Sequence, residues 1–210
     1  MSRVNTKWIA GVAVLSALAY ALSLMRLHMR FPLLPFLSFD FSEIPDILAY
    51  FMFGLSGGVI ASLAHWIALN FGTPFHQLIG PTMKLLAVLS TLAGLELASR
   101  LKGGLQIVNN VSLPLLTRVS VMAAATFLLY YYLFPSVYLP FSRRTLSGVG
   151  ITVESDLTLA TVMVIFTSIF NIIHVFLSVI PAYVIYNRIV AVLPQLPTKQ
   201  QPVRREVNKL

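Results

Sequence analysis

The stretch FLSFDFSEIPDILAYFMFGLSGG, residues 36–58, decides the fold of this chain. Three carboxylates, those of Asp40, Glu43 and Asp46, lie together just before an apolar run that continues to Gly54. Acidic residues and a proline ahead of an apolar run are typical of a helix start, because they face orphan backbone N–H groups and the positive end of the helix dipole. The stretch therefore predicts a helix that begins near Glu43 and carries negative charges at its N-terminal end.

Composition indicates an integral membrane protein. Hydrophobic residues make up 57% of the 210 residues and charged residues only 10%, with a mean hydropathy of +0.82, which is too apolar for a soluble domain. The net charge of +8 does not indicate nucleic-acid binding, because the basic residues are not interleaved with aromatic residues and lie mostly between apolar runs. The chain has no cysteine, which excludes disulfides and thiolate metal sites.

Apolar runs predict six membrane-spanning helices, because a span needs roughly 20 apolar residues. We expect these helices at residues 8–25, 43–56, 57–71, 80–99, 113–134 and 157–187. The second and third are short and meet at a glycine-rich segment, so we expect other helices to enclose them partly.

The segments between and after these helices are predicted to be irregular. Residues 28–41 contain two prolines and should form an extended loop. Residues 135–156 should form a second loop, and the basic residues 194–210 a disordered cytoplasmic tail. The predicted fold class is therefore all-α, with a single six-helix membrane domain over residues 1–193.

Lysine and arginine residues set the expected orientation, because the side of the membrane that carries more of them is cytoplasmic. Ten fall on the side of the two termini: Arg3, Lys7, Arg100, Lys102, Arg118, Arg188, Lys199, Arg204, Arg205 and Lys209. Four fall on the other side: Arg26, Arg30, Arg143 and Arg144. Both termini are therefore predicted to be cytoplasmic, and the acidic cluster to face outward.

The last expected helix carries a polar stripe of Ser168, Asn171, His174 and Ser178. A polar stripe in a membrane helix must face protein or water. Asn171 and His174 lie near the middle of the helix and are candidate ligand contacts, with a hydrogen-bonded histidine between helices as the alternative.

Two further positions are candidates for ligand contact. Lys84 lies about one turn into the fourth expected helix, where a lysine usually faces a cavity or a counter-charge unless it extends to the membrane surface. Tyr131 belongs to a run of three tyrosines, for which an interfacial aromatic belt is the default explanation and stacking on a flat ligand the alternative.

Ala13, Ala17 and Ala21 repeat at every fourth position of the first expected helix. Small residues allow a second helix backbone to approach closely. The spacing alone does not distinguish packing within the chain from docking against another membrane protein.

The sequence contains no phosphate-binding loop, no metal-ligand spacing and no serine/histidine/aspartate arrangement, so we expect neither an enzyme nor a bound metal or cofactor. A rival interpretation makes Asp40, Glu43 and Asp46 the metal ligands or acid/base groups of an intramembrane enzyme. That interpretation requires carboxylates from a second element, and Glu96, at the opposite membrane face, is poorly placed to supply one.

Residues 39–45, FDFSEIP, resemble the leucine-aspartate-phenylalanine-serine-aspartate-valine-proline signature of the riboflavin-type substrate-binding (S) components of energy-coupling factor (ECF) transporters. Residues 170–173, FNII, are similar to the phenylalanine-asparagine-isoleucine-isoleucine-lysine run of the same subfamily. The Gly80-Pro81 pair and residues 15–19, LSALA, also agree. Together the matches span most of the chain in the right order.

The resemblance implies a vitamin-binding subunit of the cell membrane, with riboflavin as the expected ligand, that works with a transmembrane coupling protein and two cytoplasmic ATPases. It also implies that the alanine stripe meets the coupling protein and that the first outer loop closes over the ligand. We therefore expect residues 33–42 to form a lid, with Phe36, Leu37 and Phe39 facing the ligand and Asp40 anchoring its end.

Three positions depart from the riboflavin-type pattern and leave the ligand open. His174 stands where those members carry lysine, and Lys84 where a neutral polar residue is usual. The three tyrosines at 130–132 replace an asparagine-tyrosine-phenylalanine run. The alternative is a different vitamin, or an anionic small molecule that Lys84 would contact.

Overall fold

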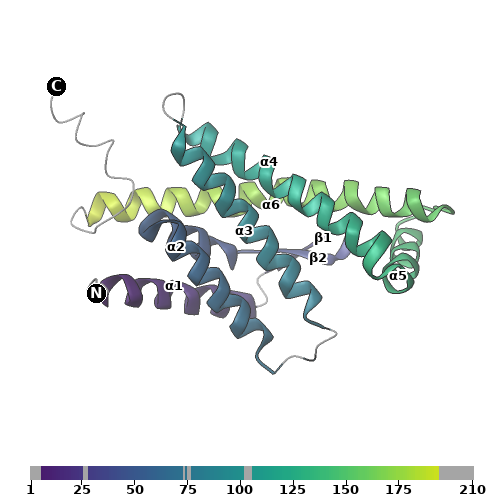
Figure 1. The fold of residues 1–210 in the computed structure, drawn as a ribbon, viewed down its shortest axis with the longest axis horizontal. Helices are drawn as coiled ribbons and strands as arrows, with labels where there is room; N and C mark the ends of the chain where they lie inside the picture. Colours follow the sequence, from purple (N-terminus) through teal and green to yellow (C-terminus); the bar gives the residue numbers. More distant parts are fainter. Residues whose placement is uncertain (1–5, 26–27, 73, 75–76, 102–105, 194–210) are drawn as a thin grey trace.

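A computed structural model shows a mostly helical chain and describes residues 6–25, 28–72, 74, 77–101 and 106–193 (Figure 1). The elements are α1 (Thr6–Leu24), β1 (His28–Phe31), β2 (Leu34–Asp40), α2 (Glu43–Asn70), α3 (Ile79–Arg100), α4 (Gln106–Phe127), the π-helix η2 (Leu128–Leu133), α5 (Pro135–Gly148) and α6 (Asp156–Val192). Among the described residues, five helical segments are long and apolar enough to cross a membrane: α1, α2, α3, α4 with η2, and α6. The predicted tail, residues 194–210, lies outside the described residues.

The structure has five such segments instead of six because the expected helices 43–56 and 57–71 are the two arms of one bent helix, α2 (Figure 1). The bend lies at Gly54, whose backbone has φ of 80° and ψ of −173°. This region of backbone space is essentially restricted to glycine. A hydropathy pattern locates the glycine-rich break but does not show that the helix continues on both sides of it.

The bend at Gly54 gives a first testable prediction. Gly54→Ala should lower the free energy of unfolding by about 1–3 kcal/mol, because a Cβ atom is strained in this conformation. Thermal unfolding in detergent measures the effect. Gly148→Ala is the matched control, since an added Cβ there meets nothing within 4 Å and the backbone φ is not positive. Equal melting temperatures for both variants would contradict a strained bend.

Residues 28–41, expected to be an extended loop, are extended but pair as an antiparallel hairpin. Asp40 pairs with His28, Phe39 with Met29 and Ser38 with Arg30, and the register becomes irregular toward the turn. The two prolines exclude a helix, as expected, but they do not prevent the flanking residues from forming a short ladder. The hairpin therefore carries a defined set of side chains to one end of the helix bundle.

The prediction of a loop at 135–156 is wrong, because α5 occupies most of it. The helix expected at 113–134 also begins earlier, at Gln106, and passes through Pro114. A proline removes one hydrogen bond of the helix, which membrane helices tolerate. The Thr117 hydroxyl, one turn after Pro114, lies 2.9 Å from the Leu113 carbonyl and 2.8 Å from the Ser90 carbonyl of α3, so it joins α4 to α3.

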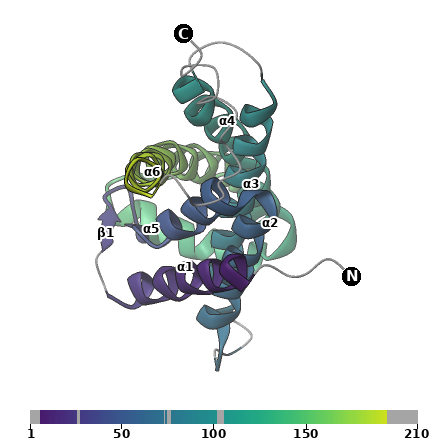
Figure 2. The ribbon, with the colours of Figure 1, turned by 90° about the vertical axis from the view of Figure 1, so that its left-hand side faces the viewer.

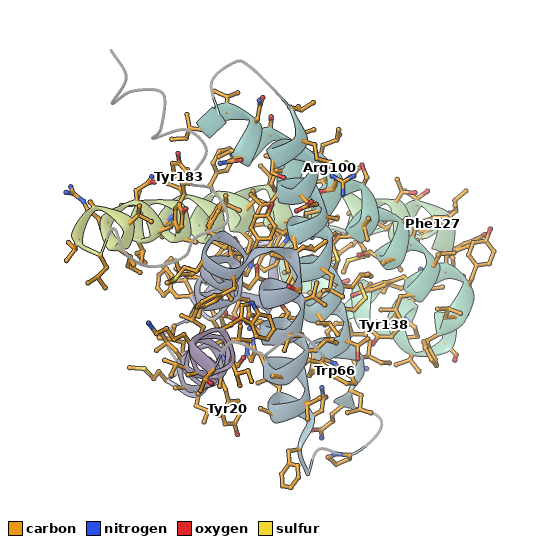
Figure 3. The ribbon with its side chains drawn as sticks, turned by 60° about the vertical axis from the view of Figure 1, so that its left-hand side comes forward. Tyr20, Trp66, Arg100, Phe127, Tyr138 and Tyr183 are labelled. Carbon is orange, nitrogen blue, oxygen red and sulfur yellow. The ribbon has the colours of Figure 1, made fainter. Side chains whose placement is uncertain are left out.

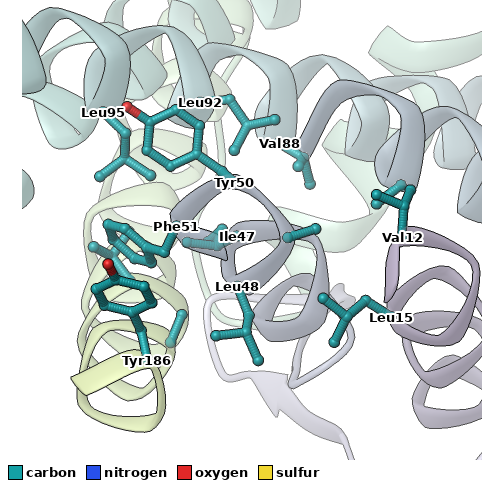
Figure 4. Close-up of a cluster of buried hydrophobic side chains, with 14 of the residues drawn as sticks. Val12, Leu15, Ile47, Leu48, Tyr50, Phe51, Val88, Leu92, Leu95 and Tyr186 are labelled. Atoms are coloured by element: carbon teal, nitrogen blue, oxygen red, sulfur yellow. The ribbon is translucent and has the colours of Figure 1, made fainter. Parts of the chain in front are cut away.

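Two apolar clusters hold the helices together. The first joins α1, α2, α3 and α6, with the rings of Phe51 and Tyr186 next to each other and Ile47 beside Phe51 (Figure 4). The second lies under the hairpin, between β2, η2, α5 and α6. Figure 2 shows α1 at one side of the bundle, next to α2. Residues of the second cluster line a large cavity.

Aromatic side chains lie near both ends of the molecule, as in membrane proteins with interfacial aromatic belts. Phe127 and Tyr138 lie at the end that carries α5, and Tyr183 lies toward the opposite end (Figure 3). The first residue of α1 and the last residue of α6 also lie at that opposite end (Figure 1).

Candidate ligand-binding site

A cavity of about 340 Å³ lies between the hairpin, the start of α2, α3, α4, η2, α5 and α6. This volume falls within the range of small-molecule pockets, about 300–1,000 Å³. The walls are mostly apolar, and a few polar groups converge at one side. The apolar lining residues include Phe36, Leu37, Ile79, Met83, Met122, Leu129, Tyr130, Tyr138 and Phe170.

An ion pair fixes the end of the hairpin to α3. The Lys84 ammonium lies 2.7 Å from Asp40 Oδ2 and donates a 2.5 Å hydrogen bond to the Ser42 hydroxyl. The backbone N–H and the hydroxyl of Ser42 both donate to Asp40 Oδ1. Burial alone would raise the pKa of Asp40, but the charge of Lys84 and the hydrogen bonds from Lys84 and Ser42 lower the pKa to about 2. We call this group of three residues the hairpin latch.

A fully buried ion pair forms the floor of the cavity. Arg118 of α4 lies 2.6 Å from Glu43 Oε2 and donates a second hydrogen bond of 3.1 Å to Oε1. The Arg118 Nε donates to the Asn171 side-chain oxygen at 2.8 Å, and Asn171 Nδ2 donates to the Thr167 carbonyl at 2.8 Å. This arrangement satisfies both oxygens of the carboxylate, which a buried charge requires.

His174 presents polar atoms that the protein itself does not satisfy. The side chain is buried, and neither ring nitrogen has a hydrogen-bond partner among the described residues. Nε2 lies 3.5 Å from Glu43 Oε1, which is close enough for attraction but not for a hydrogen bond. The ring meets Phe39 and Phe170 edge to face. Since an unsatisfied buried polar group is costly, a ligand in the cavity is the natural partner for these nitrogens.

The third carboxylate of the acidic cluster, that of Asp46, does not line the cavity. Asp46 Oδ2 lies 2.9 Å from His65 Nδ1, and His65 Nε2 lies 2.9 Å from the Ser23 hydroxyl of α1. The three carboxylates Asp40, Glu43 and Asp46 therefore pair with three different basic residues instead of converging. No group of three metal-ligating side chains occurs among the described residues. This geometry does not support the rival enzyme interpretation.

Six of the eight residues predicted to bind ligand line the cavity: Phe36, Leu37, Asp40, Lys84, Asn171 and His174. The other two, Phe39 and Tyr131, do not. Phe39 stacks on Phe170 with ring centres 4.6 Å apart, and Tyr131 stacks on Phe127 with ring centres 5.4 Å apart. Tyr130, which lies in the π-helix η2 beside Tyr131, does line the cavity.

Sequence reasoning missed the fully buried charges of the site. Counting Arg118 among the basic residues on the side of the two termini is wrong, since its side chain is 1% exposed in the middle of α4. A usable signal was present, because an arginine inside an apolar run needs a buried counter-charge. The acidic cluster supplies that counter-charge through Glu43, which was also absent from the predicted site.

The alanine stripe lies on the outside of the chain. Ala13, Ala17 and Ala21 are all exposed. The buried residues of α1, which face the rest of the molecule, are Val12, Leu15, Ser16 and Ala19. Packing within the chain therefore does not account for the stripe. A role in docking stays a prediction.

Glu96 forms an ion pair with a residue of its own helix. Its carboxylate lies 3.4 Å from Arg100, one turn later, and also accepts a hydrogen bond from the Tyr50 hydroxyl at 3.3 Å.

Comparisons with known proteins agree with the sequence motifs. The chain matches no protein-family model. It is 34% identical over 88 residues to the riboflavin transporter RibU of Staphylococcus aureus (strain TCH60), a match that covers 42% of this chain and 46% of that protein. The chain thus aligns with less than half the length of this relative.

A solved structure described as the S component of a bacterial ECF transporter superposes with a TM-score of 0.64. The match covers 89% of this chain and 97% of the other at 24% identity, which shows a shared fold. The resemblance to S components is thereby confirmed, and together with the apolar helices it indicates a multi-pass protein of the cell membrane.

Proposed function

We propose that this chain is the substrate-binding S component of an ECF-type importer and that its ligand is riboflavin. The observation that carries the proposal is the cavity of about 340 Å³ beneath the hairpin, in a chain with the S-component fold and a partial sequence match to a riboflavin transporter. The mostly apolar walls suit a flat ring system. The unsatisfied nitrogens of His174 suit the hydrogen-bonding edge of such a ring.

The charges around the cavity favour an uncharged ligand. Lys84, the candidate to form an ion pair with an anionic ligand, is already paired with Asp40, and Arg118 is paired with Glu43. A further negative charge would therefore have to displace an existing ion pair. This arrangement supports riboflavin over the alternative of an anionic small molecule.

Transport would need partners, since the sequence has no nucleotide-binding motif. We infer a transmembrane coupling protein docked on the exposed stripe of Ala13, Ala17 and Ala21, together with two ATPases. We also infer six membrane crossings, counting each arm of α2 as one, with both termini cytoplasmic. α1 begins and α6 ends at the same end of the molecule (Figure 1), and without Arg118 the count of Lys and Arg on that side is still nine against four.

Native mass spectrometry of the purified chain tests the ligand directly. A tightly held vitamin should co-purify, and we expect a bound species with the mass of riboflavin and a yellow preparation. A different co-purified vitamin would keep the S-component assignment and overturn riboflavin. A preparation that carries no small molecule and takes up none of a panel of vitamins would overturn both.

Asn171 is expected to contribute to ligand affinity. Asn171→Ala removes a cavity-lining amide and leaves Arg118 Nε without its acceptor, and the loss of one partner of a buried hydrogen bond costs about 1–3 kcal/mol. We therefore expect roughly tenfold weaker riboflavin binding or more. Asn109→Ala, on α4 and away from the cavity lining, is the control. An unchanged affinity for Asn171→Ala would remove Asn171 from the site.

The hairpin latch is expected to control ligand release. Asp40→Asn removes the charge that holds Lys84, so the hairpin should open more often and riboflavin should dissociate faster with little change in the association rate. Stopped-flow fluorescence separates the two rates. Slower association with unchanged dissociation would make the hairpin an access funnel instead of a lid.

The pKa of Asp40 sets the pH dependence of the latch. Because that pKa is lowered from 3.8 to about 2, the stabilising charge is fully present above pH 3.8 and is lost as the pH falls toward 2. The Asp40 contribution to the dissociation rate should therefore stay constant between about pH 5 and pH 8.

A further inference from the structure

The short helix α5 has two different faces. Leu139, Ser142 and Leu146 are buried against the rest of the chain. On the opposite face, Val137 is 60% exposed and Phe141 is 42% exposed. An apolar face of this kind is unfavourable in water, so it requires a partner.

Two features of its surroundings identify the partner as lipid. Immediately before α5, Leu133 and Phe134 are also exposed, and Leu133 ends a membrane-spanning segment. The exposed face of α5 is therefore continuous with a lipid-facing surface. Figure 1 shows α5 running across the axes of α4 and α6 at their shared end, the orientation of a helix that lies in the plane of the membrane interface.

The two arginines of α5 have different surroundings. Arg143 is directed at the following segment, with hydrogen bonds to the carbonyls of Val153 and Glu154 and a 2.5 Å contact with the Asp156 carboxylate. Arg144 is exposed, and it lies three residues after Phe141 and seven after Val137, on the same side of the helix. A guanidinium beside an apolar stripe complements the phosphate of a lipid headgroup.

We propose that α5 is an interfacial helix that inserts Val137 and Phe141 into the lipid leaflet on the cavity side of the membrane and binds lipid phosphate through Arg144. The partner is the bilayer itself, with anionic lipid preferred. The ring of Phe141 also lies 5.1 Å from that of Phe36 in the hairpin. The lipid-anchored helix is thus a fixed wall against which the tip of the hairpin rests.

Single-cysteine labelling tests this placement, because the natural chain has no cysteine. Val137→Cys and Ser136→Cys each receive a bimane fluorophore in nanodiscs of phosphatidylcholine and phosphatidylglycerol. Both positions are exposed, but they lie about 100° apart around the helix. Nitroxide-labelled lipid should quench the Val137 label several-fold more than the Ser136 label, and aqueous iodide should show the reverse order. Leu133→Cys is the positive control for lipid quenching.

Three outcomes are possible. The proposal is supported if nitroxide-labelled lipid quenches the Val137 label more than the Ser136 label. Quenching at Val137 should also increase with the phosphatidylglycerol fraction, and Arg144→Gln should remove that increase. Strong iodide quenching at Val137 overturns it, because the face would then be in water. Shielding of Val137 from both quenchers also overturns it, because a protein would then cover the face. Phe141→Cys gives the same readout should Val137→Cys fail to fold.

Discussion

Replacing Arg118 with methionine is expected to abolish riboflavin binding and to destabilise the protein strongly. The substitution leaves Glu43 as an unpaired carboxylate that is 1% exposed. Removing one partner of a buried ion pair costs about 3–5 kcal/mol, against a total stability of about 5–15 kcal/mol for a typical protein. The melting temperature in detergent and the riboflavin affinity measure the two effects.

A double variant separates stability from binding. Glu43→Gln with Arg118→Met removes both charges, and a neutral pair of similar volume should recover most of the lost stability. Riboflavin binding should stay weak, because the cavity floor has lost its fixed polar groups. Arg100→Met is the control, since its contact with Glu96 is at the surface and worth less than about 1 kcal/mol. If Arg118→Met is as stable as the wild type, the ion pair is not structural.

Ala17→Trp is expected to abolish transport while leaving riboflavin binding by the isolated chain intact. Ala17 is exposed on the face of α1 that points away from the rest of the molecule, so an indole there obstructs a docking helix but not the cavity. Riboflavin uptake by cells that express the chain with its coupling protein and ATPases measures the first effect. Fluorescence titration of the purified chain measures the second.

Leu18→Trp is the matched control for this substitution. Leu18 is exposed on the same helix about 100° away and is already bulky, so the change should have little effect on uptake. Wild-type uptake by Ala17→Trp and Ala21→Trp would show that the stripe has no docking role.

The sequence predicted most of the apolar helices but missed part of the secondary structure. Hydropathy located α1, α3 and α6 because a continuous apolar run of spanning length has few alternatives. It missed α5, because two prolines and a mixed apolar and basic pattern resemble a loop when read without tertiary context. It also predicted two helices, 43–56 and 57–71, where the structure has two helical arms of α2 that meet at the non-helical Gly54.

The sequence predicted those site residues that are polar side chains in an otherwise apolar helix. It missed those whose interaction partner lies far away in the sequence. Asn171 and His174 stand out in an apolar helix, and both line the cavity. The pairing of Glu43 with Arg118 joins positions 75 residues apart, which no local pattern indicates. Tyr131 does not line the cavity, whereas its neighbour Tyr130 does, and a run of three tyrosines does not indicate which of them faces inward.

A fluorescence titration tests most directly whether this chain alone binds riboflavin in the cavity beneath the hairpin. Riboflavin at fixed concentration is titrated with purified chain, in parallel with His174→Leu, and circular dichroism confirms that both proteins are helical. We expect saturable quenching with a 1:1 end point and a Kd below about 1 µM for the wild type, and binding at least about tenfold weaker for the variant. Absence of saturable quenching by the folded wild-type chain would show that it does not bind riboflavin, and equal affinity for both proteins would show that the ligand does not contact His174.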